Sequence, residues 1–180
     1  MKKILLVVFM MFSALTTFGE SIKIYSDREV SYFIDTNTLE IMVNKGNHSE
    51  VLSIAQNNLE PTNVLKNNNK ISFYRNSKNF SFKVIKNRLD ISITATKTDD
   101  KITFPQISKG VENFILPLYQ GQRIPAKDKK LKNYLISKGE EIFSERFSMA
   151  FFSSEYKHFN AMIVVGNIFN NTYKFTGYTV

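Results

Sequence analysis

The sequence predicts a mainly β protein, an antiparallel β-sandwich with one short helix. Apolar and polar residues alternate with a period of two through much of the chain, which marks strands that have one buried side. Polar turn residues separate these runs at short intervals, without helical patterns between them, as in sandwiches and barrels. Only residues 127–137 have apolar side chains at helical spacing.

The first 19 residues have the pattern of an export signal. Lys2 and Lys3 precede an apolar run at residues 4–14, and the small residues Thr17 and Gly19 follow. The run is shorter than the roughly 20 residues that a membrane-spanning helix needs. We therefore expect a signal peptide at residues 1–19, cleavage near Gly19, and a secreted, periplasmic or cell-surface protein with no membrane span. A retained membrane anchor is the alternative.

Composition limits what the remaining residues 20–180 can do. They contain no cysteine, so no disulfide supports the fold. The full chain has 16 Phe and 8 Tyr, and those within residues 20–180 must supply the buried surface. Without Lys2 and Lys3 the chain has 22 basic and 16 acidic residues, a net charge of +6. The lysines are dispersed, which argues against nucleic acid as a partner. The length suits one domain.

Alternation defines the strands of the first half. We expect polar loops at residues 57–61 and 66–70 and a turn at 76–79. The expected strands lie at residues 22–25, 30–34, 39–43, 51–55, 71–75, 80–84, 89–95 and 102–104. In the clearest of them Phe80, Phe82 and Val84 share one face. His48 falls in a polar turn.

The second half begins at residues 112–125, ENFILPLYQGQRIP, which predict a strand and a turn. A short amphipathic helix follows over Lys127–Ser137, with Leu131, Tyr134 and Leu135 at helical spacing, and Gly139 ends it. Strand character returns at residues 141–152, 161–165 and 172–180. The expected buried positions of the first of these are Ile142, Phe147, Met149 and Phe151. Because the strand-like run is still in progress at Val180, we expect the chain to be the front part of a longer protein and the domain to be incomplete there; a natural edge strand is the alternative.

No catalytic or metal-binding constellation is recognisable. His48 and His158 each lack an acidic residue or a second histidine at ligand spacing, so a triad or a zinc site has little support. A turn explains the carboxylates at residues 99–100, and a strand start explains those at 140–145. We therefore expect no catalytic residue, no metal and no cofactor.

Aromatic residues and one arginine are the remaining candidates for binding. Phe151, Phe152, Tyr156 and Phe159 are a possible sugar-stacking or partner surface, with core packing as the alternative. Arg123, between Gly121 and Pro125, is hard to explain by packing. We select Tyr119 and Arg123 as the candidate substrate-binding residues.

Two segments carry a family resemblance. ILPLYQGQRIP and, after the helix, FSMAFFSSEY with AMIVV resemble the N-terminal region of bacterial glycoside hydrolases in which a galactose-mutarotase-like β-sandwich precedes a TIM-barrel catalytic domain. The first motif, LPL-x-x-G-x-x-IP, is matched at Leu116, Pro117, Leu118, Gly121, Ile124 and Pro125. The second is matched at Ser148, Met149, Phe151 and Phe152.

The resemblance implies an exported, non-catalytic sandwich that supports a catalytic barrel and contributes to a sugar site. The family's catalytic carboxylates lie in the barrel, beyond Val180, so the resemblance gives this chain no catalytic residue and leaves open whether it belongs to an enzyme. A stand-alone carbohydrate-binding or adhesion module at the cell surface is the alternative. A mutarotase-type enzyme would require histidines and carboxylates that converge on one face of the sandwich.

Overall fold

The computed structural model describes residues 21–26, 30–95, 102–107, 110–117, 121–142, 151–165 and 172–174. These residues form three four-stranded sheets, one two-stranded sheet and one helix. All neighbouring strands in the sheets are antiparallel. The predicted class, mainly β and sandwich-like with one short helix, is confirmed.

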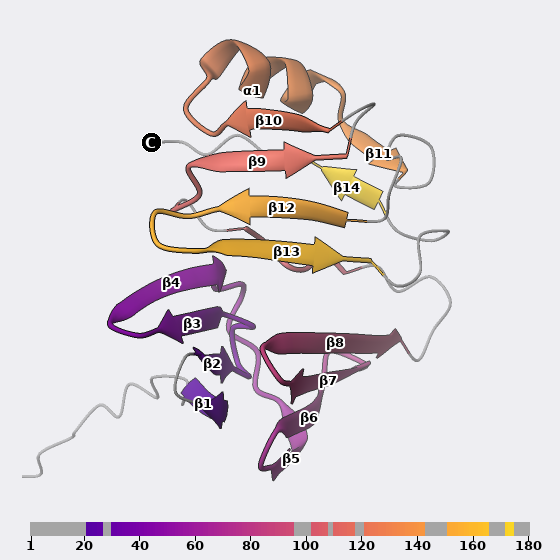
Figure 1. Ribbon diagram of the computed structural model, residues 1–180. Helices are drawn as coiled ribbons and strands as arrows, with labels where there is room; N and C mark the ends of the chain where they lie inside the picture. Colours follow the sequence, from indigo (N-terminus) through magenta and orange to yellow (C-terminus); the bar gives the residue numbers. More distant parts are fainter. Residues whose placement is uncertain are drawn as a thin grey trace, which may run out of the picture.

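The first two sheets are up-and-down meanders that form the sandwich. Their strand orders are β1–β2–β3–β4 and β5–β6–β7–β8, and Figure 1 shows them side by side in the lower part of the molecule. The first sheet comprises β1 (Ser21–Ser26), β2 (Val30–Asp35), β3 (Ile41–Lys45) and β4 (His48–Ser53). The second comprises β5 (Thr62–Asn67), β6 (Lys70–Arg75), β7 (Lys78–Ile85) and β8 (Arg88–Ala95).

A hydrophobic cluster, the first cluster, fills the space between these sheets. Alternate side chains of a strand point to the same side, so apolar residues two apart meet across the sandwich. The rings of Phe73, Phe80 and Phe82 stack with centroids 5.4–6.4 Å apart, and Phe104 meets Phe80 and Phe82 edge-on. The other buried members are Ile24, Tyr32, Ile34, Leu39, Ile41, Val43, Ile71 and Val84.

The third sheet has the order β10–β9–β12–β13 and lies above the other two in Figure 1. Its strands are β9 (Asn113–Leu116), β10 (Gln122–Pro125), β12 (Phe151–Glu155) and β13 (Asn160–Val164). The helix α1 (Lys129–Ser137) covers one side of it, and β11 (Glu140–Ile142) pairs with β14 (Thr172–Lys174). Under the helix lies a second cluster: Leu116, Ile124 and Leu135, with Phe114, Leu131, Phe152 and Val165 packed against them.

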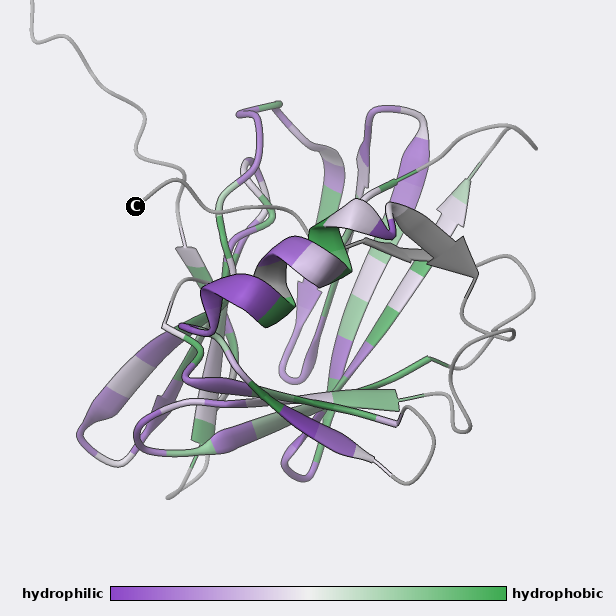
Figure 2. Ribbon diagram, turned by 90° about the horizontal axis from the view of Figure 1, so that it is seen from above, coloured by the Kyte–Doolittle hydropathy of each residue, from purple (hydrophilic) through white to green (hydrophobic). Residues whose placement is uncertain are grey.

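The helix has defined ends but a narrower apolar side than expected. The Asp128 side chain accepts a hydrogen bond from the Leu131 backbone N–H at 3.0 Å, which caps the N-terminus, and Gly139 adopts a positive φ of 73° just past the C-terminus. Figure 2 shows mostly polar residues along α1, with apolar residues on one side. The expectation that Tyr134 lies on the apolar side is wrong, because its side chain is exposed and the Lys138 ammonium lies 4.9 Å from its ring centroid.

Several predicted boundaries are also wrong. Residues 66–70 do not form a loop throughout, because β5 extends from Thr62 to Asn67; all six of its side chains are exposed, so no alternation marks it. Residues 102–104 are not in a strand. The strand expected at 51–55 begins earlier, at His48, which therefore lies in β4 and not in a turn, and Lys78 and Asn79 belong to β7.

Some predictions fall outside the described residues. These are the signal peptide, the acidic residues Asp99, Asp100 and Glu145, the aromatic Tyr119, and the expected buried positions Phe147 and Met149. The described part of the chain contains no helix long and apolar enough to cross a membrane.

Candidate functional site

The side of the third sheet that faces away from α1 is the main candidate surface, and we call it the outer face. Its residues follow from the strand register, which pairs Arg123 with Ile115, Ile115 with Ser153, and Ser153 with Met162. The next rows add Phe151 opposite Val164, and Pro125, Asn113, Glu155 and Asn160. In Figure 1 no described element lies in front of this sheet.

The outer face carries an apolar area at its β12–β13 end. Met162 and Val164 each retain 65% of their accessible surface, and their register partners Ser153 and Phe151 are half-buried. The expectation that Phe151 is buried is therefore wrong. Large apolar side chains that are exposed side by side on a regular sheet are more typical of an interaction surface than single exposed residues are.

Arg123 lies on the same face and is paired there. Its Nε donates to a Glu155 carboxylate oxygen at 2.7 Å, so the side chain reaches across β9 from β10 to β12. The Arg123 side chain is largely solvent-exposed, and exposed ion pairs of this kind contribute at most about 1 kcal/mol to stability. The pair holds the guanidinium on the outer face without burying it. Arg123 thus stays available to a ligand or a partner.

The turn between β12 and β13, residues 156–159, joins the third sheet to the sandwich, and we call this contact the junction. Phe159 packs against the first cluster, and its ring lies 5.2 Å from that of the buried Tyr156. Phe152, by contrast, packs into the second cluster under α1. The four aromatic residues that the sequence offered as one surface are therefore divided between the outer face, the junction and the second cluster.

The same turn brings the two histidines together, which overturns the expectation that each stands alone. His158 in the turn stacks on His48 at the start of β4, with ring centroids 3.7 Å apart and planes inclined by 7°. Both side chains are exposed. Among the described residues no group of three or more His, Asp or Glu side chains is placed to hold a metal ion, so a mutarotase-type convergence of histidines and carboxylates is not seen there.

A polar depression of about 520 Å³ lies between the β6–β7 turn and residues 55–59 and 102–106. Arg75, only 6% exposed, lines it together with Gln56, Asn57, Asn76 and Gln106. The Arg75 guanidinium donates to the backbone carbonyls of Asn37 and Asn57. Burial lowers the pKa of Arg75, and the nearby Asp35 carboxylate partly offsets this. This arginine joins two loops to β6 and gives the depression a positive wall.

Sequence reasoning selected Arg123 but missed Ile115, Glu155, Met162 and Val164. The alternation within each strand indicates which residues share a face, but not which face α1 covers. Arg75 was missed because a charged residue in a strand pattern normally points to solvent.

Comparison of the chain with protein-family models, curated proteins and solved structures gives no match. The resemblance to the galactose-mutarotase-like domain of glycoside hydrolases therefore stays a prediction.

Proposed function

We propose that the protein is an exported, non-catalytic β-sandwich module that docks a partner domain on its outer face. The exposed apolar pair Met162 and Val164 is the observation that carries this proposal. Burial of such side chains against a partner contributes roughly 25 cal/mol for each Å² of apolar area removed from water. The Arg123–Glu155 pair on the same face provides the polar rim that specific interfaces have.

The partner that we propose is a catalytic TIM barrel of a glycoside hydrolase. Support for this choice comes from the LPL-x-x-G-x-x-IP motif, because its Ile124 and Pro125 belong to β10 of the sheet whose outer face is exposed. A sheet face with an exposed apolar area at one end suits a folded domain better than a small polar ligand, which concave sites bind. The module supports the barrel, and residues of the barrel carry out catalysis.

The experiment uses the chain without residues 1–19 and with a biotin-acceptor tag as bait, followed by mass spectrometry. The extracts come from source cells in which the codons for residues 20–180 are deleted, so that a barrel encoded by the same gene lacks its own module. The test variant combines Met162→Gln with Val164→Thr, which keeps side-chain size but makes the outer face polar. Leu65→Gln is the matched control, because Leu65 in β5 is 68% exposed on a different sheet.

We expect the wild type and Leu65→Gln to retain a glycoside hydrolase catalytic domain, and the double variant to lose it. Retention of that domain by the double variant would exclude the outer face as the docking surface. Recovery of partners of other classes only, by the wild type, would reject the hydrolase partner.

Carbohydrate binding by the module itself is the second candidate function, and the polar depression beside Arg75 and the exposed Arg123 support it. Carboxamide and guanidinium groups are donors that suit sugar hydroxyls and acidic sugars. A glycan array followed by calorimetric titration tests this function. Saturable binding that Arg123→Ala abolishes would favour a carbohydrate site on the outer face, and binding that only Arg75→Met abolishes would favour the depression. Absence of binding to every glycan would favour the docking module.

A further inference from the structure

His48 and His158 form an exposed pair at the junction. In the part of the chain that the structure describes, their only side-chain interaction is the ring stack at 3.7 Å. They come from different elements, the edge strand β4 and the β12–β13 turn. Among the described residues no hydrogen-bond partner occupies their ring nitrogens, which can therefore bind a species from solvent.

Neutral imidazole is the commonest protein ligand for transition-metal ions and suits Zn²⁺, Cu²⁺ and Ni²⁺. Metal–nitrogen bonds measure about 2.0–2.1 Å, so two nitrogens bound to one ion lie roughly 3–4 Å apart. The two ring centroids are 3.7 Å apart, so the imidazoles are close enough to share one ion. The rings are stacked with planes only 7° apart, and their in-plane nitrogen lone pairs converge on one ion only after the rings turn. Because both rings are at the surface, rotation of their side chains is enough to direct one nitrogen of each toward a common point.

We propose that His48 and His158 together bind a divalent transition-metal ion, with water in its remaining coordination positions. The order of affinity for such ions places Cu²⁺ above Ni²⁺ and Zn²⁺. This site uses no residue of the outer face. The bound ion ties β4 to the β12–β13 turn, and it thereby holds the third sheet against the sandwich.

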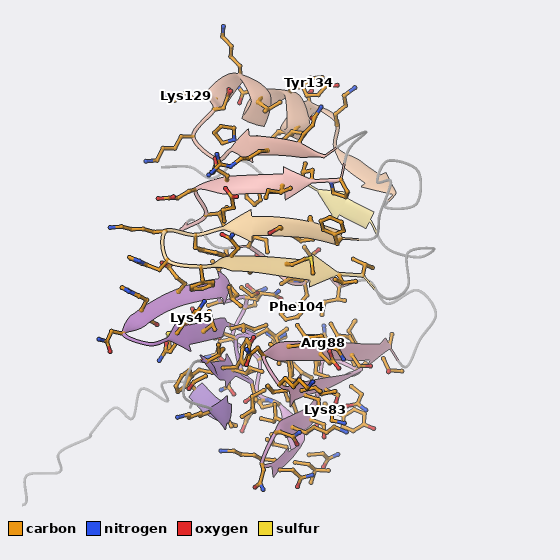
Figure 3. All side chains as sticks on the ribbon, viewed as in Figure 1. Lys45, Lys83, Arg88, Phe104, Lys129 and Tyr134 are labelled. Atoms are coloured by element: carbon orange, nitrogen blue, oxygen red, sulfur yellow. The ribbon has the colours of Figure 1, made fainter. Side chains whose placement is uncertain are left out.

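Charged residues near the two histidines affect the affinity of the site for a metal ion. Lys45 is the direct cross-strand neighbour of His48, and Lys157 precedes His158 in the turn. Figure 3 labels Lys45 beside β4. Both lysines are exposed, so their ammonium groups weaken metal binding through solvent without blocking it. Cβ atoms of residues directly opposite in a ladder are about 4.5–5.5 Å apart. A carboxylate at position 45 would therefore lie within reach of an ion on His48.

The experiment uses the chain without residues 1–19 and without a polyhistidine tag, freed of metal with a chelator. Cu²⁺, Zn²⁺ and, as a control, Mg²⁺ are titrated calorimetrically and in thermal unfolding. The variants are His48→Gln, His158→Gln and Lys45→Glu, each of which changes an exposed side chain. Equal melting temperatures of all four proteins in chelator show that the variants keep the fold.

We expect one Cu²⁺ per chain, weaker binding of Zn²⁺, no binding of Mg²⁺, and a melting temperature that rises with Cu²⁺. Either glutamine variant should weaken Cu²⁺ binding at least about tenfold, and Lys45→Glu should strengthen it. No Cu²⁺ binding by the wild type, or binding that either glutamine variant retains unchanged, would overturn the proposal. If a variant melts earlier in chelator, the Lys45→Glu titration decides: unchanged or weaker binding in that protein counts against the site.

Discussion

Replacement of Arg75 by Met should destabilise the protein much more than the same change at Arg88. Both arginines belong to the same sheet and lie beside tight turns, Arg75 at the end of β6 and Arg88 at the start of β8. Arg75 is buried and donates to the carbonyls of Asn37 and Asn57. Arg88 is exposed, and its Nε donates to Asp90 at 2.6 Å. The methionine side chain keeps most of the apolar stem in each case.

The magnitude follows from the two hydrogen bonds. A hydrogen bond to a charged group contributes about 1.5–3 kcal/mol, so two contribute roughly 3–6 kcal/mol. Removal of the guanidinium also relieves its desolvation, the effect that lowers the pKa of Arg75. We therefore expect a net loss of about 2–3 kcal/mol. With a slope of about 2 kcal/mol per molar urea, the unfolding midpoint should fall by roughly 1–1.5 M.

Urea unfolding followed by circular dichroism measures both variants against the wild type. Arg88→Met should leave the midpoint unchanged within error, because an exposed ion pair contributes little. Arg75→Lys should restore only part of the loss, since one ammonium cannot reproduce the forked geometry of a guanidinium that bonds two carbonyls. A loss below about 0.5 kcal/mol for Arg75→Met would mean that water replaces the guanidinium at both carbonyls, and the reasoning would be wrong.

Three further stability changes follow from single contacts. Asp128→Ala removes the helix cap and should lower the free energy of unfolding by about 1 kcal/mol in urea titrations, whereas Asp128→Ser should not. Lys86 has a φ of +55° in the β7–β8 turn, a conformation that glycine adopts without strain. Lys86→Gly should therefore raise the free energy of unfolding by roughly 0.5 kcal/mol and raise the melting temperature slightly. A lower melting temperature would contradict this. Phe82→Ala should cost about 3–5 kcal/mol in calorimetry, and a cost below 1 kcal/mol would mean that the first cluster collapses around the vacancy.

Much of the sandwich could be predicted from the sequence because β2, β3, β6 and β7 alternate between buried and more exposed residues. Phe80, Phe82 and Val84 share a face in the sequence and are all buried in the structure. The strand β5 could not be found in this way. All its side chains are exposed, and β5 is held by backbone hydrogen bonds to β6, which leave no trace in the order of apolar and polar residues. Neither the strand propensity of the residues nor the order of apolar and polar residues identifies an edge strand of this kind.

The candidate surfaces were less predictable because they depend on tertiary contacts. The apolar run at residues 161–165 indicated a strand, but it did not indicate that Met162 and Val164 would face solvent while Ile163 would not. That outcome depends on which side of the sheet α1 covers. His48 and His158 are far apart in the sequence and share no ligand spacing. Their stacking depends on the packing of Phe159 against the first cluster, which no local pattern encodes.

The β12–β13 hairpin connects the two proposals physically. Its strand β13 carries Met162 and Val164 of the outer face, and its turn carries both His158 and Phe159, which contact the sandwich. The orientation of the outer face relative to the sandwich is therefore governed by the contacts of one turn. A metal ion on the histidine pair would stiffen that turn without touching the docking surface. It would act on partner binding only through the orientation of the hairpin, so substitution of the histidines should leave the apolar contacts of the outer face intact.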